Sequence, residues 1–389
     1  MFRDPRILVL LAAGSLTTMA GGVVSPVLPE IIEQLQLDPA LAGNLVSLHC
    51  LTIALFSPPL GILADRIGRL RILIPSLVGY AIFGTAGAFI DDLAPLLVTR
   101  GLLGAASGGI AAASLGLLGS MYEGEARSQA LGYATSTLTL TGIAFPLLGG
   151  WVGSFDWHYA FYLYAIAFPL AFLTALTFGK QPPQKPKTKV KSDSLGLTTV
   201  LGNPETLRLL LTLSLASIAM YAVVIYAPIY LKQTIGAGST LNGIVLASRA
   251  VGAAIISAFG AKPLAKKIGG AGAIALGFGL MALTLITIPV LSQLSLILVT
   301  AVFFGVGFGL VLPNLYNSLA NLAPSELRSS VLAAGTGAGF LGQFVSPLLL
   351  GIILGFSGLE MVFYVAAIVA MTAGFLLFVP RTSPPNPLS

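Results

Sequence analysis

Two side chains that can carry a positive charge, His49 and Arg249, lie inside long apolar stretches of the sequence. A charge near the centre of a bilayer costs about 2.5–3.5 kcal/mol, so a basic residue there is expected to face the inside of a helix bundle and to have a function. An offset of 200 residues aligns Leu41 and Gly43 with Leu241 and Gly243, and it also aligns His49 with Arg249. We therefore expect both to contribute to a substrate-binding site near the middle of a membrane. The alternatives are structural: a neutral histidine bonded to a neighbouring helix, and an arginine held by backbone carbonyls.

Three uncharged polar residues in the apolar stretches, Tyr221, Gln343 and Asn314, are further candidates for substrate binding. Each could instead bond between helices, because polar side chains often join helices in membranes. The same two interpretations apply to a second group of polar residues, namely Ser217, Thr137, Thr141, Tyr316 and Asn317.

Acidic residues are missing from the middle of the apolar stretches. All 14 Asp and Glu residues lie in loops or at the ends of these stretches, and Glu30 is the deepest. Proton coupling would therefore have to use His49, Glu30, Asp65 or the charge of the substrate itself. The sequence contains no metal-ligand cluster, phosphate-binding loop or nucleotide domain, so we expect no metal, no cofactor, no enzymatic activity and no ATP-driven pumping by this chain alone.

The composition indicates which solvent surrounds the protein. Apolar residues make up 56% of the 389 residues and charged residues only 9%, whereas about 25% of the residues of a soluble protein are charged. This balance excludes a cytosolic enzyme, a nucleic-acid-binding protein and a disordered protein, and it favours a lipid bilayer. The single cysteine, Cys50, cannot form an internal disulfide and is expected to be inert packing.

The apolar stretches predict twelve membrane-spanning helices, since one helix needs about 20 apolar residues. The sequence lacks the alternating polarity of a β-barrel, so a helical bundle is expected. The first stretch, preceded by Arg3 and Arg6, resembles a signal peptide but lacks a clean cleavage site, and we expect it to be retained. The predicted spans are residues 7–29, 41–63, 72–90, 94–116, 129–153, 158–178, 207–231, 241–260, 271–290, 295–319, 330–354 and 360–379.

The distribution of Lys and Arg predicts the orientation. With both termini in the cytoplasm, Lys232 alone of the 20 Lys and Arg residues falls outside, and Arg100 and Arg249 fall within spans, which leaves 17 on the cytoplasmic side. Positive residues favour the cytoplasmic side of a membrane. We therefore expect a multi-pass protein of the plasma (inner) membrane with both termini in the cytoplasm.

A polar segment at residues 179–205, which includes QPPQKPKTKVKSDS, is typical of a flexible cytoplasmic linker. It divides the chain into an N-terminal six-helix bundle, residues 1–178, and a C-terminal six-helix bundle, residues 206–389. The two bundles are predicted to be copies of each other, because at an offset of 201 residues 125–128 (EARS) coincide with 326–329 (ELRS) and Pro146 coincides with Pro347. Parallel repeats of this kind are typical of secondary transporters whose halves rock to alternate access.

The loop after the second predicted span carries a charged motif, GILADRIGRLR, at residues 61–71. Gly61 and Gly68 permit a close helix approach and a tight turn. Asp65 can pair with an arginine or sit at a helix N-terminus. A charge cluster of this kind can hold a gate in one conformation and release it in another. In the second half, Lys266, Lys267 and Gly269 recur without an acid at the position of Asp65, so its gate is expected to be weaker.

This loop resembles the signature loop of the major facilitator superfamily, Gly-x-x-x-Asp-Arg-x-Gly-Arg-x-Arg. Together with the twelve spans, the repeat and the central linker, the resemblance covers nearly the whole chain. The alternative is that the arginines only set the topology. The resemblance implies a gating loop formed by Gly61, Asp65, Arg66, Gly68, Arg69 and Arg71.

Two further segments are similar to motifs of this superfamily. Arg100 begins Arg-Gly-Leu-Leu-Gly-Ala, which resembles the span-four motif whose arginine is linked to proton coupling, although Leu103 stands where the family has Gln. The segment ending in Pro146, Gly149 and Gly150 is similar to the antiporter motif of twelve-span drug:proton efflux proteins, with another residue in place of the glycine before the proline. The resemblance implies a role in coupling, and the alternative is a packing hinge.

The sequence therefore predicts an all-α membrane protein with twelve transmembrane helices in two parallel-repeat halves, the major facilitator fold. The leading hypothesis is a secondary active transporter that exports drug-like or amphipathic compounds by proton antiport and alternating access. The alternative is an organic-anion transporter or exchanger that uses Arg249 and His49. A lipid-interacting or sensor protein is a third possibility that fits the intact repeats poorly. Expected partners are a small-molecule substrate and the bilayer, without nucleic acid, and the protein is expected to be monomeric.

Overall fold

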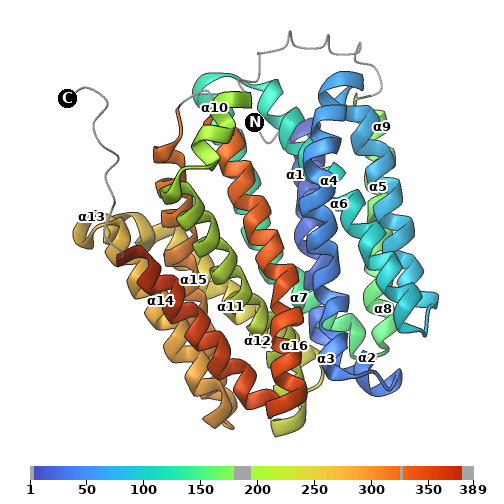
Figure 1. The fold of residues 1–389 in the computed structure, drawn as a ribbon. Helices are drawn as coiled ribbons and strands as arrows, with labels where there is room; N and C mark the ends of the chain where they lie inside the picture. The colour runs from blue at the N-terminus through green and yellow to red at the C-terminus, as the bar shows by residue number, and fades with distance from the viewer. Residues whose placement is uncertain (1–3, 179–193, 325–326, 379–389) are drawn as a thin grey trace.

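The computed structural model describes residues 4–178, 194–324 and 327–378, and all its regular elements within these ranges are helices (Figure 1). The N-terminal half contains six membrane-length segments. They are formed by α1 (Pro5–Gly22) with η1 (Ser25–Val27) and α2 (Leu28–Gln34); α3 (Pro39–Ala42) with α4 (Asn44–Ile67); α5 (Arg69–Ala86) with η2 (Gly87–Phe89); α6 (Leu93–Met121); α7 (Gly124–Gly153); and α8 (Trp157–Tyr162) with η3 (Leu163–Ile166) and α9 (Ala167–Phe178).

The C-terminal half has a parallel order of elements. Its elements are α10 (Ser194–Leu201), α11 (Pro204–Ile235), α12 (Ser239–Ile255), η4 (Ile256–Gly260), α13 (Ala261–Ile268), α14 (Gly270–Thr287), η5 (Ile288–Val290), α15 (Leu294–Leu322), α16 (Arg328–Phe375) and η6 (Leu376–Phe378). Here the structure differs from the predicted linker of residues 179–205: its residues 194–201 form α10, and α11 begins at Pro204. Residues 179–193 of that linker lie outside the described residues.

Eleven helices of the described chain are long and apolar enough to cross a membrane. The last of them, α16, is 48 residues long and contains Gly358 with φ 81° and ψ 176°, which interrupts the helical geometry. The break separates residues 328–357 from residues 359–375, so α16 supplies two crossings. The prediction of a twelve-helix all-α membrane fold is confirmed.

Glycine ends matched helices in the two halves. Gly68 follows α4 with φ 109°, and Gly269 follows α13 with φ 80°. Positive φ values favour glycine because it lacks a Cβ atom. The two positions are 201 residues apart, which is the offset of the sequence repeat.

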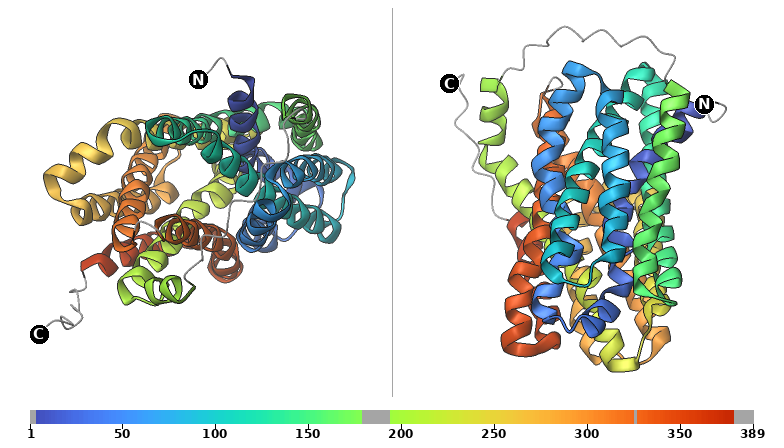
Figure 2. Two further views of the ribbon diagram at one scale, coloured as in Figure 1. Left: turned by 90° about the horizontal axis from the view of Figure 1, so that it is seen from above. Right: turned by 90° about the vertical axis from the view of Figure 1, so that its right-hand side faces the viewer.

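The helices stand side by side as two bundles, with the N-terminal half on the right and the C-terminal half on the left in Figure 1. The start of α1, the end of α9 and α10 lie at one end of the molecule, which we call the terminal end. The short helices α2 and α3 lie at the opposite, distal end (Figures 1 and 2). Helices α1, α4 and α7 of the N-terminal half face helices α11, α12 and α16 of the C-terminal half.

Candidate functional site

A cavity of about 330 Å³ lies between the two halves. Its walls come from α1, α4 and α7 of the N-terminal half and from α11, α12 and α16 of the C-terminal half. Among its described lining residues there is no acid. They are Thr17, Thr18, Gly21, Gly22, Ser25, His49, Leu138, Gly142, Pro146, Met220, Tyr221, Val224, Leu246, Arg249, Phe340 and Gln343.

The distal end of the molecule is closed by two interfaces that the repeat makes equivalent. A Cβ atom on Gly243 of α12 would collide with the carbonyl oxygen of Pro146 in α7. In the matching interface, a Cβ atom on Gly43, just before α4, would lie 2.9 Å from the Cβ of Pro347 in α16. Small residues let helix backbones approach closely in membranes. The two halves therefore pack closely against each other at this end.

Polar contacts between the halves also lie at the distal end. The amide Nδ2 of Asn242 donates to the carbonyl oxygen of Pro26 at 3.2 Å. The ammonium of Lys232, at the end of α11, lies 3.9 Å from Oε1 of Glu30 and 3.4 Å from Oε2 of Glu33 in α2. The other carboxylate oxygen of Glu30 is buried without a hydrogen-bond partner. Glu30 is thus placed at an interface that must separate if this end opens.

His49 and Arg249 occupy equivalent positions in the two halves, and both line the cavity. Gly104 of α6 packs against the backbone of His49, and Gly305 of α15 packs against the backbone carbonyl of Arg249. Both pairs of contacts are so close that a Cβ atom on either glycine would collide with that backbone. The structure brings the two residues together across the cavity, at the repeat-related positions that the sequence alignment gave them.

The guanidinium of Arg249 has no hydrogen bond or ion pair with any described residue. Arg249 is 9% exposed, and its Nε atom is buried without a partner. Tyr221 and Gln343, two other predicted substrate-binding residues, line the same cavity. The site therefore holds a buried cation to which no described residue supplies a hydrogen bond or ion pair.

Cys50, which was expected to be inert packing, joins the two halves at the level of the cavity. Its Sγ donates to Oε1 of Gln343 at 3.1 Å and lies 3.2 Å from the hydroxyl of Tyr221. It also lies 3.5 Å from Nε2 of His49, whose Nδ1 atom is buried without a partner. One signal in the sequence could have identified Cys50, namely its position next to His49. Thr17 and Thr18 also line the cavity without having been predicted, although their hydroxyls interrupt an apolar stretch.

Arg100 lies behind the cavity, inside the N-terminal half, and is fully buried. Its Nη1 donates to the hydroxyl of Tyr164 at 3.0 Å and reaches the carbonyl of Ala20 at 3.5 Å. Its guanidinium carbon lies 4.9 Å from the ring centres of both Phe161 and Tyr164. Nε and Nη2 have no hydrogen-bond partner. Aromatic faces stabilise such a cation, so Arg100 is held within its own half.

Asn314 does not line this cavity, so the structure does not bring it to the other predicted substrate-binding residues. Its amide donates to the carbonyl of Leu310 at 2.8 Å, one turn back in α15. A side chain that bonds along its own helix is oriented by that helix and not by a ligand. Ser217 is buried, and Thr141 lies 3.0 Å from Thr18 in a contact between α7 and α1.

The predicted gating loop lies at the terminal end, between α4 and α5. Asp65 pairs with Arg69 at 2.9 Å, and Nη1 of Arg69 donates to the carbonyl of Gly116 in α6. Arg66 and Arg71 are exposed. Gly61 faces Ala112 of α6 at an ordinary contact distance of 3.5 Å. In this conformation the loop ties together three helices of one half.

The glycines after Pro146 are contact points of α7. A Cβ atom on Gly149 would collide with the backbone of Val23, and one on Gly150 would collide with the carbonyl of Ser239. Gly149 therefore sets the approach to the first span, and Gly150 sets the approach to the other half. Close packing explains the residue types here, and the contact of Gly150 belongs to the closed distal end.

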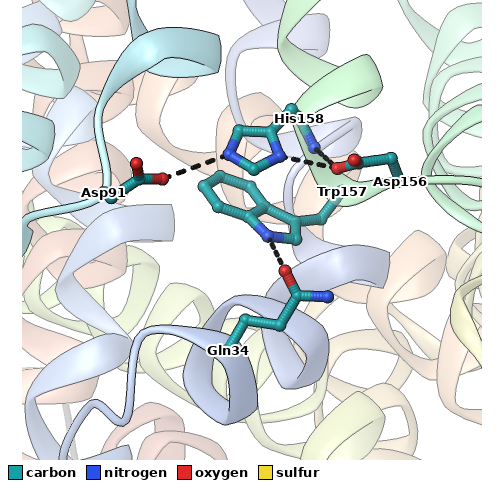
Figure 3. A network of polar contacts seen from close by, with 5 residues as sticks. All are labelled: Gln34, Asp91, Asp156, Trp157 and His158. Carbon is teal, nitrogen blue, oxygen red and sulfur yellow. Dashed lines mark hydrogen bonds and ion pairs between the residues drawn. The ribbon is translucent and has the colours of Figure 1, made fainter.

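The loops at the distal end of the N-terminal half hold a polar network that the sequence reasoning missed (Figure 3). His158 lies between Asp156, 2.6 Å from Nδ1, and Asp91, 3.3 Å from Nε2. The indole of Trp157 donates to Oε1 of Gln34 at 2.7 Å. Burial raises the pKa of Asp156. The hydrogen bonds from the backbone and the side chain of His158, together with the charge of His158, lower this pKa by a larger amount, so it lies below its ordinary value. The network joins α2, the α5–α6 connection and α8 within one half.

Comparisons with known proteins agree with this architecture. The family model described as Major Facilitator Superfamily matches residues 10–339 and 209–389. The chain is 35% identical over 184 residues to the class G tetracycline resistance protein of Vibrio anguillarum, an alignment that covers 46% of each chain. It is 27% identical over 380 residues to the multi-drug resistance efflux pump PmrA of Streptococcus pneumoniae serotype 4, which covers 94% of each chain.

A solved structure shows the same fold at low sequence identity. It is a bacterial homologue of the human lysosomal transporter Spinster in an inward-facing and occupied conformation. The TM-score is 0.79 at 15% identity, with 96% of this chain and 95% of that chain covered. At this identity the likeness supports the arrangement of helices and not the substrate.

Proposed function

The chain belongs to the Major Facilitator Superfamily and is a secondary transporter of a membrane; we propose that it exports drug-like or amphipathic compounds by alternating access, driven by proton antiport. The observation that carries this proposal is the cavity between the halves, which α1, α4 and α7 line from one side and α11, α12 and α16 from the other. Binding at the interface of two repeats is the arrangement from which transporters rock to expose a site to either side.

The closed distal end supports alternating access. The α7–α12 and α4–α16 interfaces are related by the repeat, and both include close glycine and proline contacts. Rocking one half against the other can separate both interfaces together. The ion pairs of Lys232 with Glu30 and Glu33 would break in the same movement.

The cavity lining supports an amphipathic substrate. Leu138, Met220, Val224, Leu246 and Phe340 provide apolar surface. The relatives that are named for resistance to tetracycline and for multi-drug efflux support export over import. A binding site that is mainly apolar with a few polar groups is the usual form of a small-molecule site.

The coupling proton would be carried by His49 or Glu30. Among the described lining residues of the cavity, His49 carries an imidazole, a group that can bind and release a proton. Glu30 lies at the distal interface with one carboxylate oxygen unpartnered. Proton binding to Glu30 would weaken its attraction to Lys232 and so favour opening of that end.

Transport in proteoliposomes tests the proposal. We expect tetracycline or a fluorescent amphipathic dye to accumulate when a pH gradient is imposed, and accumulation to collapse when an ionophore removes the gradient. The double variant His49→Gln with Glu30→Gln should lose gradient-driven accumulation but keep exchange of labelled for unlabelled compound. Lys262→Gln, on exposed α13, is the matched control. Full gradient-driven accumulation by the double variant would contradict the coupling assignment, and gradient-independent accumulation would contradict antiport.

A further inference from the structure

We propose that the central cavity binds an anionic group of an amphipathic substrate, and that Arg249 is the residue that binds it. The inference rests on the proposed role of the cavity as the transport site, and it names the chemical class of the compound. Its starting point is the guanidinium of Arg249, which lines the cavity, is 9% exposed and has no hydrogen bond or ion pair with any described residue.

An unpaired guanidinium in this position is costly. Arginine remains protonated at all physiological pH values. A buried charge is normally paired or hydrogen-bonded, because its desolvation is otherwise uncompensated. The described lining residues of the cavity include no carboxylate, so the compensation for Arg249 has to come from the contents of the cavity.

The backbone holds Arg249 at this place. Its carbonyl oxygen packs directly against Gly305, and Gly309 packs against Ala253 one turn further along α12. Because these glycines fit α12 tightly against α15, α12 cannot rotate freely to turn the side chain toward another partner. Gly104 makes the equivalent contact with the backbone of His49, so this glycine–backbone contact is repeated in both halves of the fold.

Two further polar groups lie on the same side of the cavity. Gln343 accepts a hydrogen bond from Cys50 with Oε1, which leaves its amide nitrogen, Nε2, free to donate. The hydroxyl of Tyr221 contacts Cys50 and also lines the cavity. Arg249, Gln343 and Tyr221 come from three helices of the C-terminal half, and together they suit a carboxylate or a similar anion.

The electrostatic setting of the cavity favours the same charge. Arg100, the second buried arginine, lies one helical turn before Gly104, whose backbone packs against His49. It has no carboxylate partner among the described residues, so it adds positive potential behind the N-terminal wall. The apolar remainder of the cavity, including Phe340 and Leu246, fits a hydrophobic body. The favoured ligand therefore carries one anionic head group on an apolar frame.

Binding of three anthracene derivatives to the purified protein in a non-ionic detergent tests this assignment. 9-Anthracenecarboxylate, 9-anthracenemethanol and 9-aminomethylanthracene share one ring system and differ in the charge of the head group. We expect the carboxylate to bind at least about 10-fold more tightly than the alcohol, because a hydrogen bond to a charged group is stronger than one between neutral groups. The amine should bind most weakly.

Variants at Arg249 separate recognition of the anion from a general loss of structure. Arg249→Gln should weaken the carboxylate about 10- to 100-fold and leave the alcohol within about threefold. Arg249→Lys should fall between, because it keeps the charge but loses the bidentate geometry. Leu246→Glu keeps Arg249 and offers it a carboxylate three residues away on the same helix, so it should also abolish the preference for the carboxylate. Lys262→Gln, which removes an exposed cation, should bind all three compounds as the unaltered protein does.

Several results would overturn the inference. Three of them concern the anthracene derivatives: equal affinity for all three, tighter binding of the amine, or an equal effect of Arg249→Gln on all three. The fourth is displacement of the carboxylate by chloride alone at an equal concentration, which would indicate a small-anion site. The binding assay uses no gradient, so it is independent of transport. Transport of a cationic dye that does not depend on Arg249 would remove this inference and leave the proposed function. Arg249-dependent binding of the carboxylate without transport of any compound would remove the proposed function instead.

Discussion

The two halves repeat one backbone plan, but their buried arginines differ in the contacts that surround the guanidinium. Arg100 of the N-terminal half is enclosed by Phe161 and Tyr164 and bonds to the hydroxyl of Tyr164. Arg249 of the C-terminal half lines the cavity, and its guanidinium has no hydrogen bond or ion pair with any described residue. A charge that its own half stabilises has a structural role, whereas one that the fold leaves unpaired is available to a ligand.

The same difference extends to the charged loops at the terminal end. In the N-terminal half, Asp65 pairs with Arg69, which also donates to the carbonyl of Gly116. In the C-terminal half, α13 presents Lys266 and Lys267 to solvent, with no acid at the position equivalent to Asp65. Asp65, Arg69 and Arg100 thus hold the N-terminal half together, while Lys232 of the C-terminal half pairs with Glu30 and Glu33 of the other half and Arg249 faces the cavity.

The largest expected effect comes from replacing each buried arginine by methionine. Arg100→Met removes a charge-assisted hydrogen bond and two cation–π contacts, so we expect a loss of about 2–4 kcal/mol of stability. Arg249→Met removes an uncompensated buried charge, so we expect unchanged or increased stability, of the order of 1 kcal/mol, with transport lost. Melting temperatures of both variants in the same detergent, without ligand, measure the difference. If Arg249→Met proves the less stable variant, the division into structural and ligand-binding arginines is wrong.

A smaller effect, on transport alone, is expected at Asp65. Asp65→Ala should reduce the initial rate of transport about 10-fold or more while insertion and expression remain near normal, because an exposed ion pair contributes only about 0–1 kcal/mol to stability. Lys266→Ala, in the loop that lacks the acid, should stay within about twofold of the unaltered rate. Rates are normalised to the amount of protein in the membrane. Normal transport by Asp65→Ala would remove the gating role.

The smallest effect is expected at Asp156, which caps α8 and pairs with His158. Its pKa is lowered in the folded protein, so its carboxylate stabilises the fold above the ordinary value of 3.8, and this contribution is lost as the pH falls through the lower folded pKa. Asp156→Ala should cost about 1 kcal/mol at pH 7 through loss of the cap, and less at pH 3. Thermal unfolding at the two pH values measures this.

The transport rate of Asp156→Ala is the second readout for this site. Because the network of Asp156 and His158 lies within one half, the rate at neutral pH should remain within about twofold of normal. A transport defect without a stability defect would show that the pair of Asp156 and His158 also acts on the movement between the halves.

The sequence by itself determined the number of membrane segments, the repeat and the class of protein. Long apolar runs are recognisable because each must match the thickness of the bilayer. The correspondence of Pro146 with Pro347 was visible at an offset of 201 residues and that of His49 with Arg249 at an offset of 200, and the structure places these pairs in equivalent contacts. Even the break in α16 falls at a glycine between two predicted spans.

Only the tertiary structure decided which polar side chains share the cavity. Most of the spanning helices are apolar around their whole circumference, so the sequence contains no polar face that fixes their rotation. Rotation is set by close contacts such as those of Gly104 and Gly305 with neighbouring helices. These contacts turn Arg249 into the cavity, leave Asn314 bonded within its own helix, and make Cys50 a link between the halves.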